Sequence, residues 1–263
     1  MPEPILTATG LTKVYGMHTV VDHVSFTLPA GGSLAIVGES GSGKTTVARM
    51  LTGLERPTAG TIVACGSDRS VPGRGARERR RRGGEVQIVF QDPYSSLDPR
   101  QTGAASIDEV LRLHRGGAKP VRSARVDELA DLVGLDQRQL VALPRSLSGG
   151  QRQRIAIARA LAAEPQILVL DESVAALDVS IQAQILNLLA DIQRATGISY
   201  ILISHDLAVV RQLTDHTIVM HRGRIVEAGP TARILDAPQQ EYTRLLRDSV
   251  PRAGWKPQRR QVT

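Results

Sequence analysis

The sequence predicts an α/β fold, in which a sheet core is interrupted by a helical lobe. Strand-like and helix-like segments alternate along the 263 residues. A glycine-rich motif at 38–45 follows an apolar strand and opens a candidate helix. Two acids, Asp171 and Glu172, end a second apolar strand. Because ligands of open α/β sheets meet the carboxyl ends of the strands, these observations predict a ligand site at that edge.

The core strands are expected to be short and largely apolar. We expect strands at Val24–Leu28, Ser33–Val37, Thr61–Val63, Val86–Phe90, Gln166–Leu170 and Tyr200–Ser204, and a hairpin of His216–Met220 with Arg224–Ala228. Helices are expected at Lys44–Leu54, Gln151–Ala163, Ile181–Ile192, Thr231–Asp236 and Tyr242–Val250. Between Pro93 and Leu147 the helical periodicity, around Ile107–Leu113 and Val126–Val133, indicates a small helical insertion.

Composition excludes several classes of protein. Apolar residues make up 41% of the chain, which excludes a disordered chain. No apolar stretch approaches the roughly 18 residues that a membrane span needs. The start, Met1–Pro4, lacks the basic and apolar regions of a signal peptide, and the single Cys65 is expected in a reducing cytosol.

The net charge of +7 is concentrated in two stretches. Residues 69–82 hold seven arginines and Glu78, a charge of +6. Residues 244–263 hold five arginines, Lys256 and Asp248, a charge of +5, so the rest of the chain carries 7 − 11 = −4. We interpret both stretches as a solvated loop and tail, because charge blocks usually are. Charge alone leaves nucleic acid, anionic membranes and polyanionic ligands as partners.

The motif G-x-x-x-x-G-K-T predicts a phosphate-binding loop. Its backbone N–H groups and the following helix N-terminus attract phosphate, Lys44 is expected to reach the β- and γ-phosphates, and Thr45 to ligate Mg²⁺. The bland alternative, a turn that binds nothing, is opposed by the lysine and threonine in register. The candidate ATP-binding residues of the loop are Gly38, Glu39, Ser40, Gly41, Ser42, Gly43, Lys44, Thr45 and Thr46.

The acidic pair narrows the chemistry to hydrolysis of a nucleoside triphosphate. Asp171 is placed to hold Mg²⁺, through water, and Glu172 to orient or deprotonate the attacking water. The alternative is a pair of acids that caps the next helix. The complete phosphate-binding loop elsewhere in the sequence argues against that alternative.

Leu147-Ser148-Gly149-Gly150-Gln151 precedes the helix that continues from Arg152, and this pentapeptide resembles the signature of ATP-binding cassette (ABC) ATPases. Other elements resemble that family in order, from about Thr9 to Gly229. The resemblance implies that Tyr15 stacks on adenine, that Gln91 contacts Mg²⁺ and water, that Ala176-Leu177-Asp178 crosses a dimer interface, and that His205 contacts the γ-phosphate.

The resemblance also implies an architecture and a dimer. The expected fold is a P-loop NTPase (RecA-like) sheet core with an ABC antiparallel β subdomain and an inserted helical subdomain. The core would comprise 1–92 and 159–238, the helical signature subdomain 93–158, and a basic C-terminal extension 239–263. Two chains would pack head to tail, so that Ser148, Gly149, Gly150 and Gln151 complete the ATP site of the other chain.

Three stretches resemble ATPase subunits of peptide/nickel importers: 91–100, 177–184 and 237–244. The resemblance implies an ATP hydrolase that powers uptake of peptides, nickel or a related small solute. Its partners would be a second ATP-binding subunit, identical or paralogous, two transmembrane permease subunits and an extracytoplasmic solute-binding protein. It would lie at the cytoplasmic face of a bacterial cell membrane, with no nucleic acid as partner.

The sequence departs from the family pattern at two places, and one alternative function is left open. The interface loop reads Ser173-Val174-Ala175 where the family usually has Pro-Thr-Ser, which could weaken contacts across the dimer. Gln240-Glu241 stands where the family usually has His-Pro. The alternative is a non-transport ABC ATPase that acts on nucleic acid. Its main support is the basic pI of about 10.1, but such proteins usually carry two cassettes or a long coiled coil.

Overall fold

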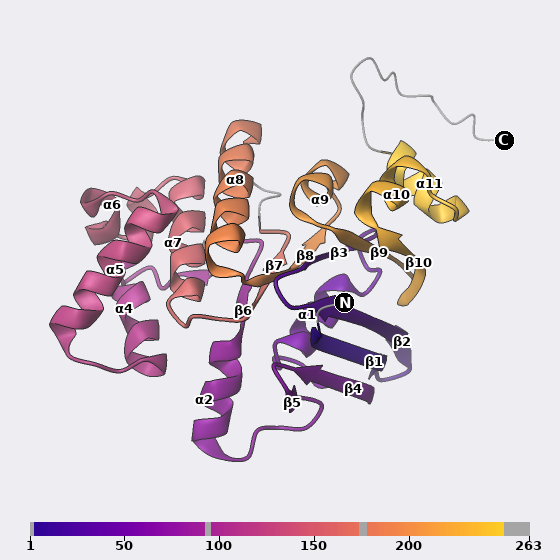
Figure 1. Cartoon of the computed structure of the whole chain (residues 1–263), viewed down its shortest axis with the longest axis horizontal. Coiled ribbons are helices and arrows are strands. Elements are labelled where there is room, and N and C mark those ends of the chain that lie inside the picture. The colour runs from indigo at the N-terminus through magenta and orange to yellow at the C-terminus, as the bar shows by residue number, and fades with distance from the viewer. Residues whose placement is uncertain (1–2, 93–95, 174–177, 250–263) are drawn as a thin grey trace.

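The computed structural model describes residues 3–92, 96–173 and 178–249, and its centre is a six-stranded sheet (Figure 1). The strand order is β10-β9-β3-β8-β7-β6, in which β3, β6, β7, β8 and β9 are parallel and β10 is antiparallel to β9. The strands are β3 (Ser33–Val37), β6 (Val86–Val89), β7 (Ile167–Asp171), β8 (Ser199–Ser204), β9 (His216–His221) and β10 (Arg224–Pro230). All residues of β3, β7 and β8 are buried, as expected for a parallel sheet covered on both faces.

A second, antiparallel sheet has the order β2-β1-β4-β5. Its strands are β1 (Pro4–Tyr15), β2 (His18–Pro29), β4 (Ala59–Ala64) and β5 (Ser67–Asp68). Helix α1 (Lys44–Leu51) packs between the two sheets, and one hydrophobic cluster joins Leu6 and Val21 of the small sheet to Val47 and to Ile201 of the large sheet. The helix that opens at the glycine-rich motif is therefore fixed from both sides.

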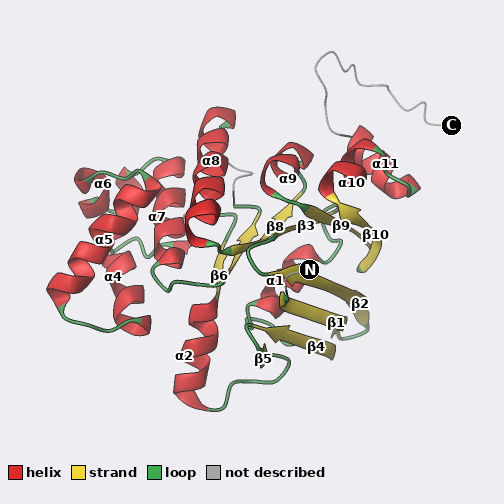
Figure 2. Cartoon of the chain, in the orientation of Figure 1, coloured by secondary structure: helices red, strands yellow, loops and turns green. Residues whose placement is uncertain are grey.

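The other face of the large sheet is covered by helices, as Figure 2 shows in red. A helical group, α4 (Gly103–His114), α5 (Lys119–Val133), α6 (Gln137–Val141) and α7 (Gly149–Leu161), lies beside β6, and α8 (Val179–Thr196), α9 (Leu207–Leu213), α10 (Thr231–Asp236) and α11 (Glu241–Asp248) complete the layer. The subdomain boundary expected at 158/159 falls inside α7. No helix in the described ranges is long and apolar enough to cross a membrane.

The arginine-rich stretch contradicts its expectation as a loop. Residues Gly75–Glu85 form helix α2, although, as expected, none of its residues is buried. Arginine is a good helix former, and two ion pairs at i,i+4 spacing, Arg82 with Glu78 and Arg81 with Glu85, offset the repulsion among the guanidinium groups. The ion pairs of Glu78 and Glu85 thus allow the arginine-rich stretch to form a helix.

Candidate functional site

The glycine-rich loop joins the buried strand β3 to helix α1. The helix begins at Lys44, and its N-cap, Gly43, has a φ of 100°, which favours glycine. A Cβ at Gly38 would lie 2.2 Å from the carbonyl oxygen of Met220, and a Cβ at Gly43 would lie 2.6 Å from that of Val20. Only glycine fits at both positions, so the loop can curl with its apex, Glu39–Gly41, exposed to solvent.

Lys44 is buried against this loop. Its Nζ donates hydrogen bonds to the carbonyl oxygens of Gly38 and Glu39, each at 2.8 Å. Burial lowers the pKa of Lys44, and the charges of Glu172 and Asp171 oppose that shift. The two acids thus hold the ammonium charge in a low-dielectric site, where its attraction for an anion is strong.

The parallel strands bring the predicted residues to one edge of the sheet. Val37 pairs in register with Ser204, Ile203 with Asp171, and Leu170 with Val89. The residues that follow these strand ends are therefore neighbours at the carboxyl edge. They are Gly38 after β3, His205 after β8, Glu172 after β7 and Gln91 after β6.

Thr45 and Asp171 form an oxygen-rich pair at this edge. The hydroxyl of Thr45 donates to Oδ1 of Asp171 at 3.4 Å. Burial raises the pKa of the Asp171 carboxyl, and the neighbouring Glu172 charge raises it further. A hydroxyl beside a buried carboxylate is the donor set that Mg²⁺ prefers.

Glu172 and His205 meet across the ends of β7 and β8. Nδ1 of His205 lies 3.5 Å from Oε2 of Glu172, and the side chains are 57% and 20% exposed. The backbone of Glu172 has a φ of 48°, in the left-handed region, and its N–H donates to the Ile203 carbonyl at 2.9 Å. A carboxylate held in a rare backbone conformation beside a histidine is a feature of functional sites.

Tyr15 ends strand β1 of the small sheet, away from the edge described above. Its ring is 43% exposed, and Nζ of Lys13 lies 4.8 Å from the ring centroid. It pairs in register with His18 of β2, the strand that also carries Val20 to the glycine loop. The structure thus leaves an exposed aromatic face on the strand pair that adjoins the loop.

The signature residues lie on the helical group. Ser148 caps α7 by a reciprocal pair of bonds: its Oγ accepts from Gln151 N at 3.3 Å, and its own N donates to Gln151 Oε1 at 2.9 Å. Gly149 opens the helix, and a Cβ at Gly150 would lie 2.6 Å from Ile181 Cγ2 of α8. Helix α7 packs on α4, α5, α8 and β6, whereas α1, which begins at Lys44, packs on β2, β7 and β8.

The expected interface loop is described only in part. Ser173 is buried and Asp178 precedes α8, whereas Val174, Ala175, Ala176 and Leu177 lie outside the described residues.

Sequence reasoning missed one direct contact to the loop. The hydroxyl of Tyr242, on α11, accepts a hydrogen bond from the backbone N–H of Glu39 at 3.1 Å. The same ring packs on His221, with ring centroids 4.0 Å apart. The resemblance of 237–244 to importer subunits marked the segment, but nothing in the sequence pairs it with residue 39.

The fold, with its site at the carboxyl edge of the large sheet, defines a P-loop ATPase of the cassette type, which binds and hydrolyses ATP. The family description "ABC transporter" matches residues 21–175. The chain belongs to the ABC transporter family.

Curated relatives of this chain are named for import or transport of peptides or glutathione. A protein of Brucella abortus (strain 2308), named for peptide import and ATP binding, is 50% identical over 89% of this chain and 70% of its own length. The glutathione import ATP-binding protein GsiA of Salmonella typhimurium is 44% identical over 95% of this chain, which spans 41% of GsiA. The di/tripeptide transport ATP-binding protein DppF of Pseudomonas aeruginosa is 43% identical over 95% of this chain and 80% of its own length.

A solved structure supports the fold. The ATP-binding cassette MJ0796, in a dimeric post-hydrolysis state bound to ADP and Pi, matches with a TM-score of 0.77 and 27% identity. The match covers 86% of this chain and 98% of that chain. The sequence expectation of a P-loop cassette fold is confirmed.

Proposed function

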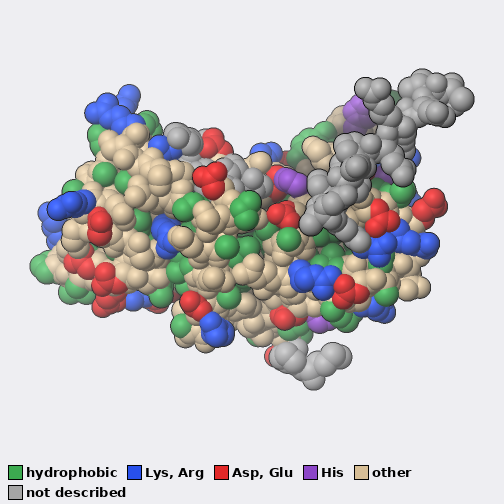
Figure 3. All heavy atoms as spheres, turned by 90° about the horizontal axis from the view of Figure 1, so that it is seen from above, with side chains coloured by type: hydrophobic (Ala, Val, Ile, Leu, Met, Phe, Trp, Pro, Cys, Tyr) green, Lys and Arg blue, Asp and Glu red, His purple; other side chains and the backbone are tan. Residues whose placement is uncertain are grey.

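We propose that the chain hydrolyses ATP to power the import of peptides or a related small solute through membrane subunits. The observation that carries this is the 43–50% identity to relatives named for peptide import, glutathione import and di/tripeptide transport, over 89–95% of this chain. Nickel is a further candidate solute, because the sequence resembles ATPase subunits of peptide/nickel importers. No comparison favours action on nucleic acid. On the face seen from above, basic and acidic side chains are interspersed (Figure 3).

ATP would bind across the glycine loop and the β1–β2 edge. The triphosphate would lie on the N–H groups of residues 39–46, with Lys44 turning from the Gly38 and Glu39 carbonyls to the β- and γ-phosphates. The exposed ring of Tyr15 would stack on adenine. The small sheet and the large sheet would thus each hold one end of the nucleotide.

Magnesium fits the oxygen donors present. Thr45 and Asp171, whose Oγ1 and Oδ1 atoms are 3.4 Å apart, would hold the ion. Gln91, which lies after β6, would be the third ligand from this edge of the sheet. When bound, Mg²⁺ would neutralise charge on the phosphates.

Glu172 would orient and deprotonate the attacking water, because it is the partly exposed carboxylate of the edge. His205, 3.5 Å from Glu172, would donate to the γ-phosphate while holding the carboxylate in place. The left-handed backbone at Glu172 is the kind of strained conformation that persists at functional sites.

A second ATP-binding subunit would complete each site. Within one chain Ser148, Gly149, Gly150 and Gln151 lie on the helical group, apart from Lys44, and form a second helix N-terminus suited to phosphate. In a head-to-tail pair, identical or paralogous, this signature would close over the partner's ATP, with Ala176, Leu177 and Asp178 at the interface. ATP would then favour the closed pair over the open one.

The further partners would be two permease subunits and an extracytoplasmic solute-binding protein, with this chain at the cytoplasmic face of a bacterial membrane. The subdomains would be a core of 1–92 and 159–238, a helical lobe of 93–158 that docks on the permease near 91–100, and the extension 239–263. The helical lobe would carry the nucleotide state to the membrane subunits as a moving body.

The test is transport in proteoliposomes that contain the assembled importer. Uptake of a labelled dipeptide that requires ATP, and that stops when Glu172→Gln replaces this chain, is the expected result. Parallel arms with glutathione and nickel identify the solute. Retained ATP-dependent uptake with Glu172→Gln would overturn the proposal, as would hydrolysis unaffected by every solute-loaded binding protein tried.

A further inference from the structure

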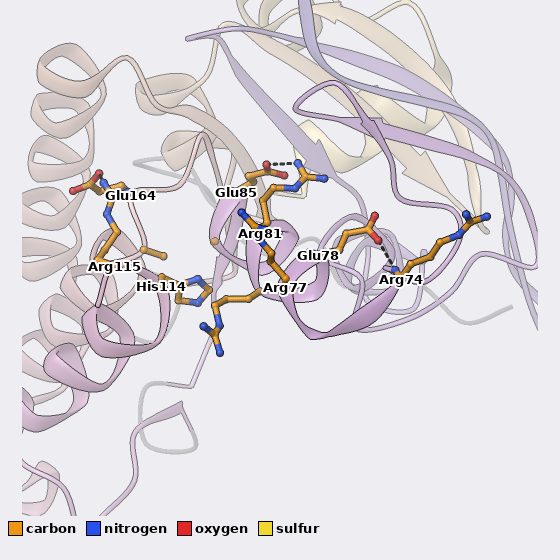
Figure 4. Close-up of a pocket in the computed structure, with 11 residues that line it drawn as sticks. Arg74, Arg77, Glu78, Arg81, Glu85, His114, Arg115 and Glu164 are labelled. Carbon is orange, nitrogen blue, oxygen red and sulfur yellow. Dashed lines mark hydrogen bonds and ion pairs between the residues drawn. The ribbon is translucent and has the colours of Figure 1, made fainter. Parts of the chain in front are cut away.

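A cavity of about 710 Å³ lies between helix α2, the end of helix α4 and the turn after helix α7 (Figure 4). Helix α2 leads directly into β6, and Glu164 in the turn precedes β7. The cavity is therefore at the amino edge of the parallel sheet, opposite the edge that carries Lys44 and Glu172. It is separate from the ATP site.

The cavity carries unpaired positive charge. Its three carboxylates are engaged in ion pairs: Glu78 with Arg82, Glu85 with Arg81 and Arg69, and Glu164 with Arg115. Arg77 and Arg80 line the same cavity and form no ion pair with any residue in the described ranges. Two guanidinium groups three residues apart lie on one face of a helix.

Helices α2 and α4 approach each other closely at one wall of the cavity. The imidazole of His114, at the end of α4, lies against Gly84 of α2, where an added Cβ would come within 3.0 Å of Nδ1. Burial lowers the pKa of His114, and the charges of Arg80 and Arg115 lower it further. The ring therefore lies close enough to Arg80 and Arg115 to feel their charges, and a bound anion would oppose their effect on its pKa.

We propose that this cavity binds the phosphate group of an anionic ligand, with Arg77 and Arg80 as its ligands and His114 at its wall. Guanidinium groups match phosphate geometry and bind it by two hydrogen bonds at once. The site does not depend on the solute that the importer carries. The cavity would be a second phosphate-binding site, on the opposite edge of the sheet from the ATP site. A ligand could therefore bind there without displacing ATP.

The test uses the full chain with its ATP site filled by ADP, and inorganic tripolyphosphate as the soluble probe. Binding is followed by calorimetry and by the imidazole resonances of His114. Arg80→Gln is expected to weaken binding about tenfold, because it removes one charge-assisted pair. The matched control is Arg79→Gln, which removes the same charge from the same helix but lines a different cavity.

A second arm identifies the source of the phosphate. Vesicles of phosphatidylcholine with and without phosphatidylglycerol are sedimented with the same variants. Binding that Arg80→Gln weakens and Arg79→Gln spares, in either arm, supports the site and names its ligand as soluble or lipid. Equal losses for the two variants in both arms, or no saturable binding in either, would overturn the proposal and leave α2 as a solvated face.

Discussion

The Tyr242 hydroxyl and the Glu39 backbone N–H are joined by a hydrogen bond of 3.1 Å across 203 positions of sequence. Tyr242 belongs to α11, and its ring also packs on His221, the last residue of β9. The N-terminus of α11 is anchored by Glu227, whose carboxylate accepts from the N–H groups of Gln239 and Gln240. The C-terminal helix is thus tied directly to the glycine-rich loop, the proposed site of phosphate binding.

Tyr242→Phe is expected to weaken ATP binding about fivefold and to leave the turnover number nearly unchanged. The substitution keeps the ring and removes one hydrogen bond of about 1 kcal/mol that positions the loop before nucleotide arrives. The measurement is the KM for ATP beside kcat. Tyr200→Phe is the control: it removes a buried hydroxyl, which donates to Leu189 at 2.8 Å, in the sheet core. It should lower the melting temperature without raising KM, and equal effects on KM would argue against a loop-specific role for Tyr242.

Glu172→Gln is expected to trap the ATP-bound dimer and to reduce turnover by about 10²–10⁴-fold, the range for loss of a general base. Glutamine keeps the shape and the contact distance to His205 but cannot accept the proton. Turnover and dimer mass are measured in ATP. Glu128→Gln, an exposed acid on α5, is the control and should change neither. Unchanged hydrolysis in Glu172→Gln would remove the residue from the base role.

Lys44→Ala is expected to abolish measurable ATP binding, a loss of at least about 100-fold, because it removes the buried cation of the loop. The comparison is Lys119→Ala at the exposed start of α5. Calorimetric titration with ATP measures both variants. Nucleotide affinity that survives in Lys44→Ala would contradict the assignment of the loop.

Gly150→Ala is expected to destabilise the protein by about 1–3 kcal/mol and to slow hydrolysis, because the new methyl group meets Ile181 of α8. The double variant Gly150→Ala/Ile181→Ala removes the obstructing Cγ2 and should recover hydrolysis. Thermal unfolding and turnover are measured as a double-mutant cycle. If the changes in stability and turnover of the double variant equal the sum of those of the two single variants, the packing of α7 on α8 does not control the function of the signature residues.

The anchor of α11 is expected to loosen in acid. Burial alone would raise the pKa of Glu227, but hydrogen bonds from the backbone N–H groups of Gln239 and Gln240 hold it below its usual 4.5. A lowered pKa means that the stabilisation is complete above pH 4.5 and is lost as the pH falls through the lower folded value. The protection factors of the α11 amides, which correct for the slower intrinsic exchange in acid, should therefore fall below pH 4.5. Glu227→Gln should remove this pH dependence, whereas Glu241→Gln, exposed on the same helix, should retain it.

Much of the site follows from the sequence because its residues stand at the ends of apolar strands. Strand Ser33–Val37 is found where it is predicted, since five buried residues and a glycine loop fix both its length and its end. Parallel pairing then places Asp171 and His205 beside that loop. Local patterning and strand direction are sufficient for this edge of the sheet.

Other parts depend on contacts that no local pattern records. Strand β1 (Pro4–Tyr15) lacks a clean alternation because its register shifts between Ala8 and Leu11, and it was not predicted. Helix α9 (Leu207–Leu213) is short, and its signal is the cap Asp206, whose carboxylate accepts from two backbone N–H groups. The bond between Tyr242 and Glu39 joins segments too distant for any sequence period to relate.

The backbone at Glu172 has a consequence for evolution of this chain. A glutamate held at a φ of 48° carries strain of about 1–3 kcal/mol that a glycine at the same position would not. Glu172→Gly would therefore relieve the backbone strain while it removed the carboxylate that we propose as the base. Stability and turnover would then oppose each other at this residue, and a selection for heat resistance that does not also demand hydrolysis should favour glycine there.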